Sequence, residues 1–211
     1  MTRADLLSAL LRDERGASAA EFGLVAPVFL MFLLGTIDVG RFMWAVNENE
    51  KAAQIGARWA VATDLICDGL TDYSFTEDED PAVPQGTLVE IGDFPGVSFA
   101  GGTATTCTCK EENGGTCDFP LTADTGSYNA LVGRMQRIQP RLDVDDVSVD
   151  YDWSGLGYAG DPNGPDVAPT VTVRIANLRF RPLIFGSLIP IGIPGAQYSL
   201  TMEDGSGTFS N

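Results

Sequence analysis

The stretch FGLVAPVFLMFLLGTI, residues 22–37, decides the architecture of this chain because its sixteen residues carry no charge. Asp38 and Arg41 interrupt the apolar pattern, which then resumes as far as Val46. At a helical rise of about 1.5 Å per residue, residues 22–46 would extend about 37 Å. The hydrocarbon core of a bilayer is about 30 Å thick, so the stretch predicts a single transmembrane helix.

Two other interpretations of this stretch are a cleaved secretory signal peptide and a buried core helix. A secretory signal has a short apolar region followed by a small-residue cleavage site, whereas Asp38, Arg41 and Trp44 occupy that place here. A core helix usually carries an apolar stripe rather than an apolar circumference. The membrane span is therefore the favoured interpretation.

The residues before the span form a second pattern. Arg15-Gly16 ends a short charged leader, and Ala17-Ser18-Ala19-Ala20-Glu21-Phe22 leads into the apolar run. Together they resemble the class III signal of the type IV pilin superfamily in its Flp/Tad form. The segments GTIDVGR (35–41) and AAQIGARWA (52–60) are similar to the TadE-like minor pseudopilin family. The resemblance covers residues 12 to about 62, and beyond them only the layout and the use of cysteine are similar.

This resemblance implies that residues 1–16 are a leader, which a prepilin peptidase of the aspartic membrane type removes after Gly16. The processing site would comprise Gly16, Ala17, Glu21 and Phe22, and cleavage would create the α-ammonium group of Ala17. In the pilin family the glutamate equivalent to Glu21 meets a terminal amine within the growing assembly and sets the axial register of neighbouring subunits. Alternatively, Glu21 is an interfacial residue at a helix start, where the helix dipole favours negative charge.

Asp38 and Arg41 are three residues apart and therefore share one face of the expected helix. Charges near lipid are costly unless they are paired. We expect a structural ion pair between the two, and the alternative is a coupling of these charges to a partner chain or an assembly machine.

The expected helix continues beyond the span. Residues 45–64 contain no proline and are rich in Ala, Glu, Gln, Arg and Lys, which favour helices. One helix over residues 17–65 is predicted, with its second half against a globular domain at 66–211. Arg12 and Arg15 place the leader in the cytoplasm by the positive-inside rule, so the C-terminal domain would be exported.

The cysteines agree with export because all four follow the span: Cys67, Cys107, Cys109 and Cys117. An even number of cysteines in an exported domain indicates disulfides. A bond between Cys107 and Cys109 would close too tight a ring. We expect Cys67 to bond one member of the loop 107–117 and the other two cysteines to bond each other locally. A zinc site is the alternative, but the usual paired knuckles are missing.

The exported domain shows turn-rich segments and short alternating runs. We expect an α+β fold, pilin-like and loop-rich, in which the long N-terminal helix packs on a small antiparallel sheet. The alternation and turn signals predict five strands and one helix. The strands are expected at 87–91, 103–110, 142–151 with a bulge at Asp145-Asp146, 170–178 as the partner of 142–151, and 196–202; the helix is expected at 127–138.

Residues 182–194 (PLIFGSLIPIGIP) are apolar but contain three prolines, so they cannot form a second span. Two interpretations stay open at this point. The segment covers the sheet and the helix as a packed loop, or it is an exposed apolar patch that contacts a partner subunit or the membrane surface.

Composition excludes several classes of function. With 13 Lys+Arg against 29 Asp+Glu, the net charge of −16 opposes binding to nucleic acid. There is no histidine for acid–base, nucleophilic or zinc chemistry, and no phosphate-loop, elbow-serine or zincin motif occurs. Residues 161–166 (DPNGPD) offer oxygen ligands but lack the closing glutamate of a calcium loop. We expect no enzyme activity, no cofactor and no metal centre.

The resemblance thus implies a minor pseudopilin that takes part in assembly of adhesive Flp/Tad pili or of the related secretion machine. Its implied partners are the prepilin peptidase, other pseudopilins, the major Flp pilin, platform proteins and membrane lipid. It would be a single-pass protein of a bacterial inner membrane with a periplasmic or extracellular C-terminal domain. The alternative function is an uncleaved, signal-anchored binding protein outside the cytoplasm.

Overall fold

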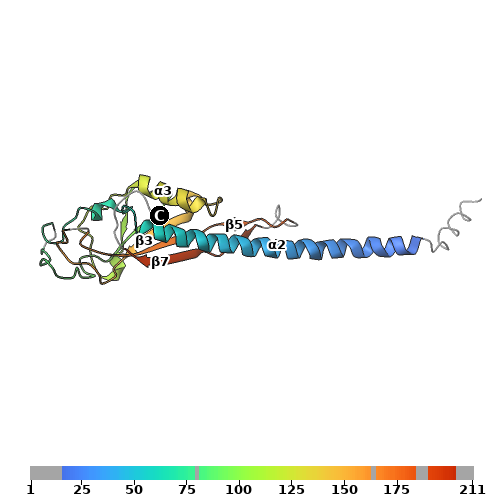
Figure 1. Ribbon diagram of the computed structural model, residues 1–211, viewed down its shortest axis with the longest axis horizontal. Coiled ribbons are helices and arrows are strands. Elements are labelled where there is room, and N and C mark those ends of the chain that lie inside the picture. The colour runs from blue at the N-terminus through green and yellow to red at the C-terminus, as the bar shows by residue number, and fades with distance from the viewer. Residues whose placement is uncertain (1–15, 79–80, 163–164, 184–189, 203–211) are drawn as a thin grey trace, which may run out of the picture. The chain divides into compact units, whose positions relative to one another are not determined.

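The computed structural model describes residues 16–78, 81–162, 165–183 and 190–202 (Figure 1). The expected leader, apart from Gly16, lies outside these residues, and so does the middle of the apolar segment 182–194. The chain divides into two compact units, Met1–Met43 with Arg181–Ile191 and Trp44–Phe180 with Gly192–Asn211. The long helix α2 contributes residues to both units.

Helix α2 spans Ala17–Ala60 and continues through Pro27, which confirms the long N-terminal helix. It ends five residues before the predicted boundary at 65. Thr63 Oγ1 donates to the Trp59 carbonyl at 2.8 Å, and such local side-chain bonds compete with helical pairing. The chain then turns so that Leu65 and Ile66 are buried, and the Ile66 N–H donates to the Tyr151 hydroxyl at 3.0 Å.

The unit Trp44–Phe180 with Gly192–Asn211, called the C-terminal unit below, is built on an antiparallel sheet of five strands. Their order is β2-β1-β3-β4-β7. This arrangement confirms the predicted α+β class. A second sheet pairs β5 with β6. The strands are β1 (Val97–Phe99), β2 (Thr108–Cys109), β3 (Val147–Asp152), β4 (Thr170–Ile175), β5 (Arg179–Phe180), β6 (Ile191–Gly192) and β7 (Ala196–Thr201).

Three strand predictions are corrected by the structure. The strand predicted at 103–110 is reduced to β2 (Thr108–Cys109). Residues 87–91 form no strand, because the Thr87 N–H closes a turn on the Pro84 carbonyl and the Trp153 indole donates to the Val89 carbonyl. The strand predicted at 142–151 begins only at Val147. The expected bulge is instead the 3₁₀ turn η4 (Val144–Asp146), in which the Asp143 and Asp146 carboxylates cap each other's backbone N–H groups.

Helix α3 spans Thr125–Gln136, whereas the sequence predicts 127–138. It begins earlier because the Asp124 carboxylate accepts from the N–H groups of Gly126 and Ser127. The predicted apolar positions of α3 are nonetheless buried, namely Tyr128, Leu131, Val132 and Met135. Short 3₁₀ turns occur also at η2 (Asp68–Leu70) and η3 (Glu111–Asn113).

The core of the C-terminal unit lies between one face of the sheet and the helices. Alternate residues of β3 and β4 are at most 1% exposed on this face: Val147, Val149, Tyr151, Val171, Val173 and Ile175. The last turns of α2 present small residues to it, among them Ala52, Ala53 and Ala57. A Cβ at Gly56 would lie 2.7 Å from Met135 Sδ and 3.2 Å from Val173 Cγ1, so the lack of a side chain allows close packing.

Two disulfides hold the loops that connect the helices to the sheet. Cys67 bonds Cys107, and Cys109 bonds Cys117, with Cα–Cα distances of 5.9 and 6.0 Å. This pairing fits the expectation of one long-range bond from Cys67 and one local bond. In the same unit, rings of Tyr73, Phe75 and Phe94 lie around Phe119 at centroid distances of 5.8 to 6.4 Å and form a small aromatic cluster.

Candidate functional site: the membrane helix and its charges

The expected processing residues lie at the start of α2. Gly16 is exposed, and the helix begins at Ala17. Glu21 and Phe22 are exposed, with Phe22 accessible over 74% of its surface. Because the helix is continuous, Glu21 stands one turn beyond Ala17. Within the described part of the chain, no ion pair involves Glu21.

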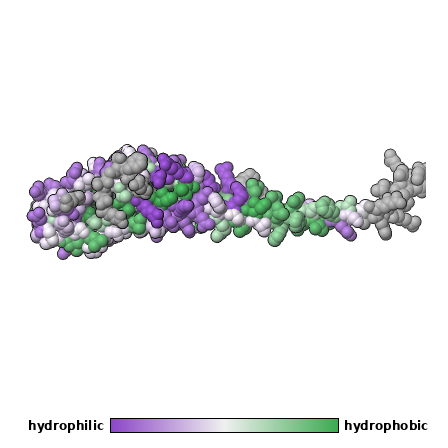
Figure 2. Space-filling view, viewed as in Figure 1, coloured by the Kyte–Doolittle hydropathy of each residue, from purple (hydrophilic) through white to green (hydrophobic). Residues whose placement is uncertain are grey.

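The first half of α2 presents apolar side chains around its surface. Large residues between Phe22 and Leu34 are each at least 37% exposed, and Figure 2 shows the green apolar band that they form. None of the apolar window of this helix is buried among the described residues. The helix is long and apolar enough to cross a membrane, which is consistent with a single-pass anchor.

Asp38 and Arg41 form the pair that their spacing predicts. Arg41 Nη1 donates to Asp38 Oδ1 at 2.8 Å. The other carboxylate oxygen, Asp38 Oδ2, accepts the backbone N–H of Leu183 at 2.7 Å. The Asp38 side chain is only 12% exposed, whereas that of Arg41 is 45% exposed. The Asp38 carboxylate therefore forms an ion pair with Arg41 and also accepts a backbone hydrogen bond from a residue 145 positions away in the sequence.

Beyond this pair, Trp44 marks the end of the apolar half of the helix. Its ring is exposed, and its indole N–H donates to Glu48 Oε1 at 2.6 Å. Tryptophan side chains of this kind concentrate at membrane–water interfaces, where the ring meets lipid and the N–H meets a polar partner. The order Asp38, Arg41, Trp44 is thus typical of one boundary of a membrane span.

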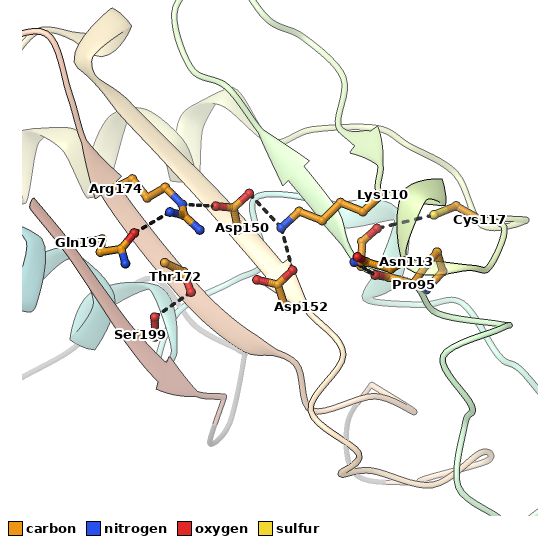
Figure 3. A network of polar contacts seen from close by, with 11 residues as sticks. Pro95, Lys110, Asn113, Cys117, Asp150, Asp152, Thr172, Arg174, Gln197 and Ser199 are labelled. Carbon is orange, nitrogen blue, oxygen red and sulfur yellow. Dashed lines mark hydrogen bonds and ion pairs between the residues drawn. The ribbon is translucent and has the colours of Figure 1, made fainter. Parts of the chain in front are cut away.

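A second polar cluster lies on the outward face of the sheet (Figure 3). Asp150 of β3 accepts from Lys110 Nζ at 3.0 Å and from Arg174 Nε at 2.6 Å. Lys110 also pairs with Asp152 at 2.6 Å. On β4 and β7, Thr172 Oγ1 and Ser199 Oγ share a 2.8 Å hydrogen bond. The cluster ties the loop after β2 to β3, and β3 to β4.

The charges of this cluster favour a structural role over acid–base chemistry. Burial alone would lower the pKa of Lys110, but hydrogen bonds and charges from Asp152 and Asp150 outweigh it and raise that pKa above its usual value. Lys110 is therefore protonated at neutral pH and forms ion pairs with both Asp150 and Asp152. A lysine that served as base or nucleophile would need the opposite shift.

In the segment 161–166, the Asp166 carboxylate, which could have bound calcium, forms hydrogen bonds within the protein. Asp166 is buried, and its two carboxylate oxygens accept the backbone N–H groups of Phe75 at 2.9 Å and Asp161 at 3.0 Å. Residues 163 and 164 lie outside the described residues. Asp166 thus holds two loops together.

The part of the chain that matches a known family is the segment that contains Glu21, Asp38 and Arg41. Residues 16–58 match the family of TadE-like proteins. The match begins at Gly16 and includes Glu21, Asp38 and Arg41. No curated protein and no solved structure matches the chain.

The matched segment 16–58 thus includes the expected processing residues and the pair of Asp38 and Arg41. The structure places Gly16 directly before α2 and places Ala17, Glu21 and Phe22 in its first two turns. It pairs Asp38 with Arg41. Sequence reasoning missed the bond from Leu183 to Asp38 and the central place of Asp150. The outward positions of β3 and β4 could have indicated the second feature, because Asp150 and Arg174 carry opposite charges on neighbouring strands.

Proposed function

We propose that this chain is a minor pseudopilin of an Flp/Tad-type pilus or secretion system. The observation that carries the proposal is the TadE-like match over residues 16–58, which starts at the glycine where a pilin-type leader would be cut. A continuous helix with an exposed apolar first half supports it, because such a helix can pack against neighbouring subunits as well as lipid.

In this proposal, a prepilin peptidase cleaves after Gly16 and leaves the α-ammonium group of Ala17 at the start of the helix. A carboxylate at the membrane edge is costly unless a cation meets it. Glu21 is exposed, so it is accessible to the terminal amine of a neighbouring subunit. That contact would set the axial register between subunits.

The C-terminal unit would be exported, would act through contacts and would not catalyse a reaction. Two disulfides support its location outside the cytoplasm, where such bonds persist. Its proposed partners are other pseudopilins, the major Flp pilin and inner-membrane platform proteins, with the chain itself anchored in the inner membrane.

Gene deletion combined with site-specific photocrosslinking tests this function. The deletion strain should release far fewer assembled pili on shearing, and the intact gene should restore them. A photoreactive residue at Phe32, which is 71% exposed on the helix, should give adducts with pilin-type subunits. A photoreactive residue at Leu156 serves as an exposed control in the other unit. Normal pili in the deletion strain, together with no pilin-type adduct from Phe32, would overturn the proposal.

A further inference from the structure

The backbone bond between Leu183 and Asp38 joins an apolar segment to the membrane helix. Asp38 Oδ2 accepts the Leu183 N–H at 2.7 Å, and Arg41 holds the other carboxylate oxygen. Arg181–Ile191 and Met1–Met43 belong to one compact unit, so this contact lies inside a single body. The contact places Leu183 of the apolar segment 182–194 beside Asp38.

The position of Asp38 along the helix gives the depth of that contact. Asp38 lies seventeen positions after Glu21, which corresponds to about 26 Å of helix. The hydrocarbon core of a bilayer is about 30 Å thick. If Glu21 lies at one boundary of the core, Asp38 therefore lies at the other, and Leu183 lies beside it.

The described apolar residues at both ends of this segment are exposed. Leu183 is 59% and Ile191 44% accessible, whereas Ile193 just beyond them is 7% accessible. Arg181 is exposed as well, and Arg41 stands next to Asp38 on the helix. Apolar side chains flanked by arginines are typical of surfaces that meet lipid acyl chains below and phosphates above.

We propose that Arg181, Leu183 and Ile191 form an interfacial anchor, in which the two apolar side chains enter the outer leaflet and Arg181 meets lipid phosphates. Lipid is the favoured occupant because the patch continues the surface of the membrane helix at the level of its boundary charges. Asp38 is the positioning residue of this anchor, since its carboxylate holds the Leu183 backbone at that level. The inference rests on α2 crossing a membrane and not on the pilus role.

Tryptophan quenching by brominated phospholipid tests the anchor in the full chain. The parent is Trp44→Phe, so that the native interfacial indole does not mask the signal, and Trp59 and Trp153 supply a constant background. Leu183→Trp is compared with Phe32→Trp in the span and with Leu156→Trp, another exposed leucine at 56% accessibility. Each variant is placed in phosphatidylcholine–phosphatidylglycerol vesicles, with and without bromine near the glycerol end of the acyl chains.

The anchor predicts that Leu183→Trp loses fluorescence in brominated lipid and emits at shorter wavelength, while Leu156→Trp does neither. Quenching at position 32 without quenching at 183 would overturn the anchor and leave the membrane span intact. Absence of quenching at both positions would overturn the span as well, whatever the chain does in pilus assembly. Equal quenching at 183 and 156 would show unspecific adsorption and would also overturn the anchor.

A second comparison tests the positioning role of Asp38. Asp38→Asn keeps an oxygen that can accept the Leu183 N–H, whereas Asp38→Ala removes it. In the Leu183→Trp background, Asp38→Ala should reduce the quenching and Asp38→Asn should retain most of it. The same quenching in both variants would contradict the role of Asp38.

Discussion

Asp124 shows how one side chain determines where an element begins. It accepts N–H bonds from Gly126 at 2.7 Å and from Ser127 at 3.2 Å, and the Ser127 hydroxyl donates to it at 2.6 Å. Asp124→Ala should lower the free energy of unfolding by about 1 kcal/mol, as loss of an N-cap usually does. Asp118→Ala, at an exposed loop aspartate, is the control and should change it little. Denaturant unfolding in detergent micelles, followed by tryptophan fluorescence, measures both.

The Asp124 cap should also make the free energy of unfolding depend on pH. The Ser127 hydroxyl bond, followed by the Ser127 and Gly126 backbone bonds, lowers the pKa of Asp124 below its usual 3.8 although burial opposes this. A lowered folded-state pKa contributes stability that is present above the unfolded value and is lost as the pH falls through the folded value. Asp124→Asn keeps a cap that does not titrate. The stability of wild type relative to Asp124→Asn should therefore fall below about pH 4, and a difference independent of pH would contradict this cause.

Gly56 provides a test of close packing at a single residue. A side chain there would meet Met135 and Val173, whereas nothing lies within 4 Å of a Cβ at Gly133 on α3. Gly56→Leu should lower the free energy of unfolding by about 1–3 kcal/mol through overpacking. Gly133→Leu should be neutral or raise it by up to about 1 kcal/mol through helix propensity. Equal effects in urea unfolding would show that α2 does not pack closely at Gly56.

At the scale of elements, the two disulfides should contribute unequally to stability. Cys67–Cys107 closes a separation of 40 residues and Cys109–Cys117 one of 8. The chain-entropy relation gives about 4 kcal/mol for the longer loop and about 2.5 kcal/mol for the shorter. Replacing the first pair by alanines should therefore lower the urea midpoint more than replacing the second. A larger loss of stability from removing Cys109–Cys117 would contradict the view that these disulfides stabilise the fold mainly through loop-closure entropy.

Elements whose signals are local could be predicted from the sequence, and those organised by distant bonds could not. The uncharged run 22–37 and the alternation in 170–175 determine α2 and β4 directly. In contrast, residues 66–123 depend on disulfides and on single bonds such as the Trp153 indole to the Val89 carbonyl, 64 residues away. For the site, a spacing of three predicts the Asp38–Arg41 pair, but no local pattern indicates that Leu183 meets Asp38.

At the scale of the whole molecule, Glu21 connects the helix start to the proposed assembly. Breaking a desolvated carboxylate–amine contact costs about 3–5 kcal/mol. Glu21→Gln should therefore reduce pili sheared from cells by more than about tenfold while the protein still accumulates in the membrane. Glu50→Gln, at an exposed glutamate later in the same helix, should leave the pilus yield unchanged. Equal pilus yields from both variants would contradict a role of Glu21 in the contact between subunits.

The central claim is that this chain is a processed pseudopilin, and the N-terminus of the protein in its native membrane tests it most directly. N-terminal sequencing and intact mass are measured for wild type, for Gly16→Ala, for the control Gly23→Ala inside the helix, and for a strain without its prepilin peptidase. We predict a chain that begins at Ala17 in wild type and in Gly23→Ala, and an uncut chain in the other two. A wild-type chain that begins at Met1 or at another residue would contradict the claim and favour an uncleaved, anchored binding protein.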